Sequence, residues 1–172
     1  MKKNRIIIVV LLILIPVVYF QHERIERMIG LTESLDFRDL VKRDGLYYKK
    51  STEVPFTGKV TGKKQGSFKN GKKDGLWVRS HSNGQLWGKG IYKNGKRDGP
   101  YISYHDNGQV DYKDIYKDGK KDGLWVRYHR NGQLRTKGTY KDGKRDGPWF
   151  WYQDNGELWS KGTFKDGVRV SD

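Results

Sequence analysis

Aromatic and β-branched residues alternate with polar ones in short runs from residue 68 onward, and turn residues separate the runs. A period of two is typical of β-strands. Within residues 116–139, two such runs flank Asn131-Gly132, a strong hairpin signal because both residue types accept positive φ. A second turn, such as residues 95–99, leads to the next pair of runs. The pattern predicts two antiparallel strands per unit, joined into a continuous meander.

A tetrapeptide of the form aromatic-Lys-Asn/Asp-Gly recurs with a constant step of 24 residues. Its five copies begin at residues 68, 92, 116, 140 and 164. A fixed step of this size is typical of a repeat array, in which one unit cannot bury its apolar face alone. We therefore predict an all-β fold, an extended single-layer antiparallel meander of hairpin repeats over residues 68–172.

Alternation also divides the side chains between the two faces of this sheet. Large rings fall on one face of the first strands, and we call this the aromatic face: Trp77, Tyr101, Trp125, Trp149 and Trp151. These rings are either the buried core of the array or an exposed partner surface. Glycines inside the second strands indicate close approach by a ring of the neighbouring repeat: Gly90, Gly138 and Gly162.

The unit that precedes the array is irregular. Residues 42–47 resemble residues 72–77, but at a step of 30 instead of 24. The end of an array has an unpaired edge, so an atypical terminal repeat is expected there as a cap. We predict a capping repeat over residues 42–67 and a short strand at residues 168–172.

The amino-terminal segment, residues 1–21, has the form of an export signal. Lys2, Lys3 and Arg5 precede an unbroken apolar run over residues 6–20. As a helix this run would span about 22 Å, which is short for a hydrocarbon core of about 30 Å and favours a cleaved signal peptide.

Cleavage is disfavoured by the residues around the expected site. No small-x-small triplet follows the run, and Tyr19 and Phe20 suit an aromatic anchor at the membrane interface. We therefore expect an uncleaved hydrophobic helix, a single-pass anchor in the cell membrane with the amino terminus inside and the repeats outside the cytoplasm. The alternatives are a periplasmic or secreted protein after cleavage, and a buried helix. Residues 22–41 are expected to form a linker with a possible short helix.

The composition supports a thin, single-layer fold. Only 34% of the 172 residues are apolar, glycine occurs 22 times, and cysteine is absent. Such a chain lacks the aliphatic side chains for a thick two-layer core. The lack of cysteine excludes disulfides, thiolate metal sites and cysteine nucleophiles.

Positive charge predominates, with 35 Lys and Arg against 20 Asp and Glu and a net charge of +15. Part of this charge repeats with the array and predicts a basic rim along one edge: Lys72, Lys73, Lys96, Arg97, Lys120, Lys121, Lys144 and Arg145. Such a rim is a solvated edge or a surface for anionic lipid or an envelope polyanion. A nucleic-acid partner is disfavoured, because the rings are explained as repeat core and the export signal argues against access.

No residue set of the sequence indicates catalysis. His81, His105 and His129 occupy one repeat position, and its fourth copy is Gln153, so we interpret them as surface residues at strand ends. The turns rich in Asp, Asn and Gly lack the alternating carboxylates and the distal Glu of a calcium loop. We expect a non-enzymatic protein without metal or cofactor.

The repeated unit, aromatic-x-Asn/Asp-Gly-x-x-x-Gly-x-Trp/Tyr, resembles the MORN repeat, and more closely its bacterial variant. The resemblance covers residues 43–167. The leading segments, residues 43–50 and 55–62, resemble the capping segment of YwqK-like proteins, which are described as antitoxin components of toxin–antitoxin modules. The resemblance implies a scaffolding or membrane-associating array.

We therefore expect a protein-binding scaffold at the cell envelope, with an unidentified protein partner. One alternative is an antitoxin or immunity-like protein that neutralises a toxin by direct binding. A second alternative is binding of anionic lipid or an envelope polyanion through the basic rim. The sequence leaves the oligomeric state open.

Overall fold

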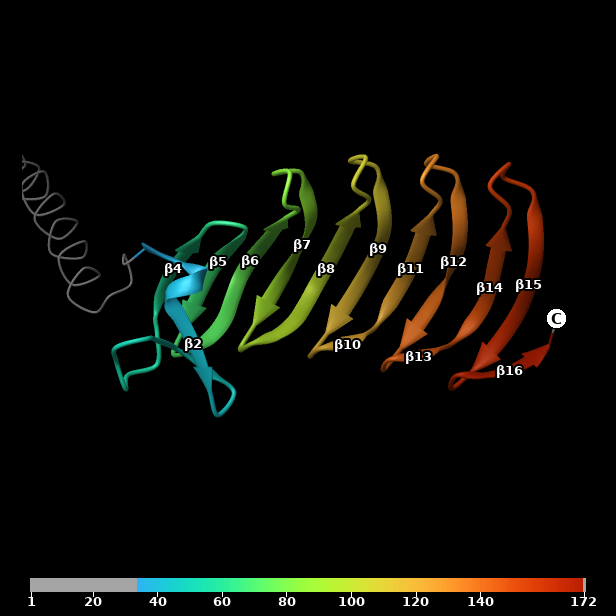
Figure 1. Ribbon diagram of the computed structural model, residues 1–172. Helices are drawn as coiled ribbons and strands as arrows, with labels where there is room; N and C mark the ends of the chain where they lie inside the picture. Colours follow the sequence, from blue (N-terminus) through green and yellow to red (C-terminus); the bar gives the residue numbers. More distant parts are fainter. Residues whose placement is uncertain (1–33, 172) are drawn as a thin grey trace, which may run out of the picture.

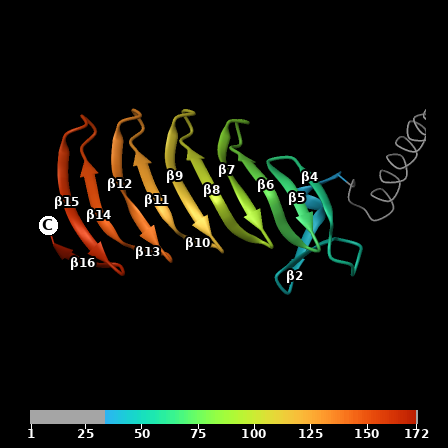
Figure 2. The same cartoon turned by 180° about the vertical axis from the view of Figure 1, so that it is seen from behind.

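The computed structural model describes residues 34–171, and nearly all of this chain is β-structure. A 14-stranded sheet runs along the whole length, and a separate two-stranded sheet lies at its amino-terminal end (Figure 1). From β4 onward the neighbours in the sheet follow one another in the sequence, so the strands form a meander. The rear view shows the same strand order, with no second layer over the strands from β7 to β16 (Figure 2). The predicted all-β array is thus confirmed.

The first elements form the cap. They are β1 (Ser34–Asp36), the 3-10 helix η1 (Phe37–Asp39), β2 (Leu40–Arg43), β3 (Leu46–Lys49), β4 (Gly58–Thr61) and β5 (Lys64–Lys69). β1 pairs with β4 in parallel, whereas we expected only antiparallel pairs. Residues 34–41, expected as linker, therefore belong to the folded cap. The predicted anchor at residues 1–21 and the possible short helix lie outside the described residues.

The remaining strands form the repeats. They are β6 (Lys72–Ser80), β7 (Leu86–Lys93), β8 (Lys96–Tyr104), β9 (Val110–Lys117), β10 (Lys120–Lys121), β11 (Gly123–Tyr128), β12 (Leu134–Lys141), β13 (Lys144–Arg145), β14 (Gly147–Tyr152), β15 (Leu158–Lys165) and β16 (Val168–Ser171). Within residues 34–171, no helix is long and apolar enough to cross a membrane.

The tightest turns lie at the opposite end of the hairpins from the one we predicted. Asn94 and Gly95 both have positive φ, 51° and 85°, and form a two-residue turn between β7 and β8. At the predicted position only Gly84 has positive φ, and the β6–β7 loop closes through a 2.7 Å hydrogen bond from His81 N–H to Gln85 O. Asn83 instead accepts the Gln85 N–H on its side chain, so this loop contains three residues.

Each long hairpin contains a β-bulge that the sequence pattern did not reveal. Arg79 lies opposite Gly88 and Ser80 lies opposite Leu86, so Trp87 is an extra residue in β7. The same register shift recurs in the next three units, where the extra residues are Asp111, Arg135 and Trp159. A bulge redirects a side chain, and the Arg79 guanidinium lies 4.0 Å from the Trp87 ring on the aromatic face.

The core of the array is a ladder of rings packed on glycine. Trp149 is completely buried, and its ring meets Tyr140 and Phe164 edge to face at 5.1 and 6.1 Å. A Cβ atom at Gly138 would lie 2.2 Å from the Trp149 indole, which explains the glycine. The predicted packing of a ring on glycine is confirmed at Gly90 and Gly138. At Gly162 the prediction was wrong, because the Arg169 guanidinium takes the place of the ring.

The cap closes the first end of the ladder. Phe56, Val60, Phe68 and Trp77 form one buried cluster, and Phe37 packs against it. Phe37 in η1 meets the Trp77 ring edge to face at 6.1 Å. Because β1, η1 and the β2–β3 hairpin fold over the first unit, the aromatic face there is covered. The face remains available only along the later repeats.

Candidate binding face

The structure divides the predicted basic rim into two sets of side chains. All eight are strand residues and not turn residues. The second member of each pair lies over the rings of the aromatic face: Lys73, Arg97, Lys121 and Arg145. The Arg97 guanidinium lies 4.0 Å from the Tyr101 ring centre, and the Arg145 guanidinium lies 4.5 Å from that of Trp149. Such cation–π contacts stabilise the ladder. These four residues therefore cap the core and do not form a free rim.

Burial in this ladder shifts the pKa values of Lys73 and Tyr101. Burial, together with the nearby positive charges of Lys64, Arg79, Arg97 and Lys42, lowers the pKa of Lys73 from 10.5 to about 8. Burial likewise raises the pKa of Tyr101 to about 12. The ladder thus disfavours a charge on Lys73 and on the Tyr101 hydroxyl.

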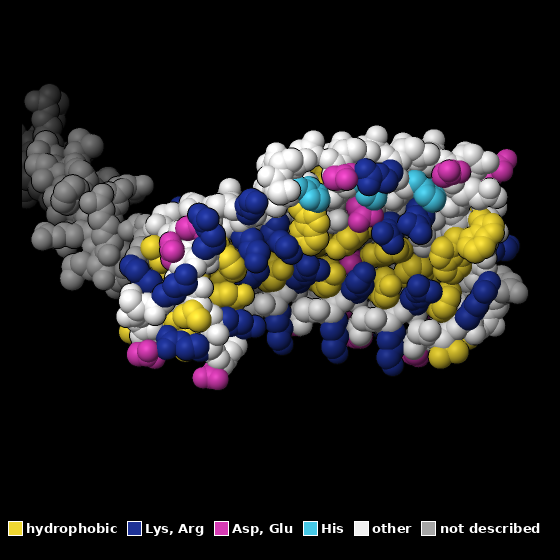
Figure 3. All heavy atoms as spheres, in the orientation of Figure 1, with side chains coloured by type: hydrophobic (Ala, Val, Ile, Leu, Met, Phe, Trp, Pro, Cys, Tyr) yellow, Lys and Arg dark blue, Asp and Glu magenta, His cyan; other side chains and the backbone are white. Residues whose placement is uncertain are grey.

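The other half of the predicted rim forms exposed lysine columns on the opposite face. Lys72 lies opposite Lys69 across the turn, and Lys96 lies opposite Lys93. We call the full set the lysine columns: Lys69, Lys72, Lys93, Lys96, Lys117, Lys120, Lys141 and Lys144. Figure 3 shows Lys and Arg side chains in a row along the turn edge of the array. The predicted rim did not include the lysine that precedes each tight turn, although this lysine belongs to the recurring tetrapeptide: Lys69, Lys93, Lys117 and Lys141.

The predicted aromatic residues differ in exposure. Trp77, Tyr101 and Trp149 are buried, whereas Trp125 and Trp151 are half-buried. The aromatic face is therefore mostly core, and its exposed part lies nearer the three-residue loops. Figure 3 shows hydrophobic side chains as a band along this face, with histidines beside it at the loop edge.

A set of residues that changes from unit to unit lies along that part of the face; one member, Ser103, is buried, and the others are half-buried or exposed. We call it the variable band; its members occupy two repeat positions, the bulge and the strand residue beside it: Arg79 with Trp87, Ser103 with Asp111, Arg127 with Arg135, and Trp151 with Trp159. The ladder positions keep aromatic residues in every unit, whereas these positions carry cations, an anion, a hydroxyl or an indole. The sequence analysis missed the bulge positions, which a comparison of the four units residue by residue would have revealed.

In the first three units, residues of the variable band contact one another. Arg79 stacks on Trp87, and the Arg127 Nε donates to Asp111 Oδ1 at 3.1 Å. His105 also approaches Asp111, with 3.7 Å between Nε2 and Oδ1. These contacts fix the side chains before any partner arrives.

Two of the three repeated histidines bridge neighbouring repeats, whereas His81 Nε2 is buried and has no hydrogen-bond partner among residues 34–171. His129 Nε2 lies 3.0 Å from Tyr152 O, and His105 Nε2 lies 3.3 Å from Tyr128 O. A carbonyl only accepts, so each Nε2 carries the proton. The expected role as surface residues at strand ends was therefore incomplete. Within residues 34–171 no group of three or more His, Cys, Asp or Glu residues is arranged to hold a metal ion.

Asp114 is a further residue that the sequence analysis missed. It occupies the position of Gly90, Gly138 and Gly162, and its side chain is fully buried. Asp114 Oδ2 lies 2.8 Å from Lys121 Nζ, so the carboxylate is paired with a cation of the next unit. The sequence signal for this residue was available, because Asp114 stands at a repeat position where the other copies carry glycine.

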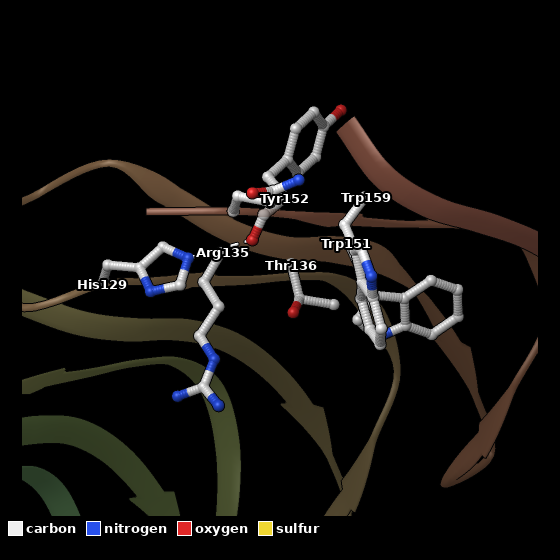
Figure 4. Close-up of a pocket in the computed structure, with 7 residues that line it drawn as sticks. His129, Arg135, Thr136, Trp151, Tyr152 and Trp159 are labelled. Atoms are coloured by element: carbon white, nitrogen blue, oxygen red, sulfur yellow. Dashed lines mark hydrogen bonds between the residues drawn. The ribbon is translucent and has the colours of Figure 1, made fainter. Parts of the chain in front are cut away.

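A groove opens at the carboxyl-terminal end of the variable band. Its volume is about 470 Å³, and it is lined by His129, Arg135, Thr136, Trp151, Tyr152, Gln153 and Trp159. Figure 4 shows Thr136 between the Arg135 side chain and the two indoles. Here an arginine, two indoles and four further polar side chains line one concave surface.

No curated protein matches the chain. Among solved structures, the chain is similar to one described as "Crystal structure of accessory secretory protein 1,2 and 3 in Streptococcus pneumoniae", with a TM-score of 0.34 and 19% sequence identity. The alignment covers 70% of this chain and 21% of that one, so the chain spans about a fifth of the length of that protein.

Four segments match the family described as MORN repeat variant: residues 73–94, 97–118, 121–142 and 145–166. They follow the 24-residue step, coincide with the hairpin units β6–β15, and together cover just over half of the sequence. Repeats of this family typically mediate protein or membrane binding. The chain belongs to the MORN repeat variant family.

Proposed function

We propose that this protein is a non-enzymatic scaffold that binds a protein partner at the cell envelope through the variable band. One observation carries the proposal: the ladder residues are nearly constant, whereas the band beside them changes in every unit and lies on one face. In a repeat scaffold, such a surface is where partners bind. The export-like pattern of residues 1–20 supports the envelope as the place of action.

The rigidity of the array supports this role. At the last four tight turns of the described chain, the glycine N–H donates to the carbonyl of the preceding unit's ladder cation, for example from Gly119 to Arg97 at 2.8 Å. The equivalent bonds from Gly95, Gly143 and Gly167 measure between 2.7 and 2.9 Å. A surface held in place before binding loses less conformational entropy when a partner docks.

Capture from envelope fractions tests this proposal. The full chain, solubilised in detergent, is compared with a band variant (Trp87→Ala, Arg127→Gln and Trp159→Ala) and a column variant (Lys72→Gln, Lys96→Gln, Lys120→Gln and Lys144→Gln). A partner that binds the full chain and the column variant but not the band variant supports the proposal. Retention of the same partner by the band variant would contradict it.

An antitoxin or immunity-like role is an alternative, and the likeness of the capping segment to YwqK-like proteins favours it. An antitoxin must protect growing cells from a toxin encoded beside it. Rescue of growth on co-expression of the neighbouring gene product distinguishes this role from a scaffold, which gives no rescue.

Binding to anionic lipid is a second alternative, favoured by the lysine columns. Each unit adds two lysines at a turn, and each lysine near an anionic membrane contributes about 1 kcal/mol. Co-sedimentation with vesicles containing phosphatidylserine tests this role. Sedimentation that falls as salt rises past about 0.15 M, and that the column variant lacks, would support it.

A further inference from the structure

The groove at the third and fourth units differs from the rest of the variable band in having unused binding groups. In the first unit the Arg79 guanidinium is stacked on Trp87, and at the second unit Asp111 accepts from Arg127. Arg135, in contrast, is exposed, and its side chain has no hydrogen bond, ion pair or ring contact within residues 34–171. Trp159 is 72% exposed, and its ring likewise has no ring or cation contact in the described chain.

The polar groups around these two residues have capacity left for a ligand. The Nε2 proton of His129 is donated to Tyr152 O, which leaves Nδ1 as an acceptor with no hydrogen-bond partner among residues 34–171. Gln153 replaces the bridging histidine in the fourth unit, and its side-chain amide makes no hydrogen bond among the described residues. The groove therefore offers an acceptor, an amide that both donates and accepts, and the Thr136 hydroxyl.

The chemistry of the groove restricts the class of ligand. A ligand that fills the groove needs a flat apolar face to stack on the Trp159 indole and an anionic group to pair with Arg135. It also needs several hydroxyls to bond with His129, Thr136 and Gln153. The volume of about 470 Å³ suits a ligand of one to a few rings. An acidic peptide supplies the charge, but it does not supply a rigid face that carries several hydroxyls.

We propose that this groove binds an acidic sugar, with the face of a carboxylated pyranose ring on Trp159 and its carboxylate on Arg135. Gln153, Thr136 and His129 Nδ1 then bind the ring hydroxyls. This ligand is additional to the protein partner proposed for the variable band, and the groove lies at one end of that band. Sugars that carry a carboxylate agree with the proposed location at the cell envelope.

Titration calorimetry of the full chain in detergent tests the site with three probes. They are a linear trimer of galacturonic acid, the uncharged galactose trimer as a matched control, and a triglutamate peptide. We expect saturable binding of the acidic trisaccharide with a Kd of about 1 mM or lower, weaker binding of the neutral trisaccharide, and no saturable binding of the peptide.

Two groove variants and two controls locate the site. Arg135→Gln should weaken binding of the acidic trisaccharide about tenfold and leave the neutral one unchanged. Trp159→Ala should weaken both, and it should stay folded because the ring is exposed. Trp87→Ala, at the same repeat position in the first unit, and the column variant should bind as the unchanged protein does.

Three results would overturn the proposal. They are no binding of the acidic trisaccharide, equal binding of triglutamate with the same response to the groove variants, and binding that the column variant loses but the groove variants keep. The first would leave the scaffold function standing, because capture of a protein partner is measured separately.

Discussion

Asp114 Oδ2 lies 2.8 Å from Lys121 Nζ at a position where three of the four repeats carry glycine. The carboxylate is fully buried, and Tyr101 lies opposite Asp114 across the strand pair. The second and third units are therefore joined by an ion pair that the glycine at this position in the other described units cannot form.

Removal of the cation alone should destabilise the protein. In Lys121→Met the Asp114 carboxylate remains buried without its counter-charge, which costs about 3 kcal/mol in the free energy of unfolding. The double variant Asp114→Gly with Lys121→Met restores the glycine of the other units and should be close to the unchanged protein. Urea denaturation measures these two variants and Asp114→Gly alone; an additive effect of the two substitutions would show that the pair is not coupled.

The glycine beneath each ring should tolerate no side chain where the ring is rigid. Gly138→Ala places a Cβ 2.2 Å from the Trp149 indole, and we expect a loss of about 1–3 kcal/mol. Gly162→Ala is the matched control, because the same repeat position there faces the flexible Arg169 side chain. Thermal unfolding should show a clear drop for the first variant and a small one for the second. Equal losses would contradict the packing.

The two central indoles should respond differently to truncation. Trp149→Ala removes a completely buried ring and should cost about 3–5 kcal/mol, whereas Trp125→Ala should cost less because Trp125 is half-buried. Substitution of each Trp by Phe should also destabilise the two positions to different degrees. Trp149 Nε1 donates to Thr139 O at 3.2 Å, while Trp125 Nε1 has no partner among residues 34–171. Trp149→Phe should therefore be the more destabilising of the two, as measured by urea denaturation.

Stability should rise with pH above neutrality because of Lys73. Its pKa is about 8 in the folded protein and 10.5 ordinarily, so between these values the unfolded chain binds more protons. The free energy of unfolding then increases with pH from about 8 upward. Tyr101, whose pKa is raised from 10.0 to about 12, gives the opposite slope above pH 10, so urea midpoints are compared between pH 7 and 10. Lys73→Met should lose the rise, and the exposed Lys72→Met should keep it.

One whole unit should be removable. Deletion of residues 116–139 joins β9 to the fourth unit at an equivalent position, and Arg145 takes the place of Lys121 beside Asp114. Since repeat stability is approximately a sum of unit and neighbour terms, the shorter protein should still unfold cooperatively. Loss of a cooperative thermal transition would contradict the modular array.

The fold followed from the sequence because the ladder repeats in strict register. The 24-residue step and the alternation identified the hairpins, the aromatic face and the glycines beneath it. The tight turn was assigned to the wrong end because Asn-Gly or Asp-Gly occurs at both ends, and at one end the Asn83 side chain stabilises a longer loop.

The candidate site was less predictable for a physical reason. A bulge shifts the register by one residue, so alternation assigns Trp87, Asp111, Arg135 and Trp159 to the wrong face. The basic pairs look alike in sequence, yet strand alternation places the Lys72 side chain on the face opposite the aromatic face and the Lys73 side chain over the rings. Residue type alone therefore reveals neither the face on which a bulge residue lies nor the face on which each member of a basic pair lies.

Site-specific photo-cross-linking in intact cells tests the variable band most directly. A photoreactive residue is placed at Trp87 or Trp159 in the band, or at Lys89, an exposed position on the opposite face. Our account predicts that the two band positions cross-link to the same protein and that position 89 does not. Cross-links from position 89 alone would place the partner on the opposite face and contradict the account.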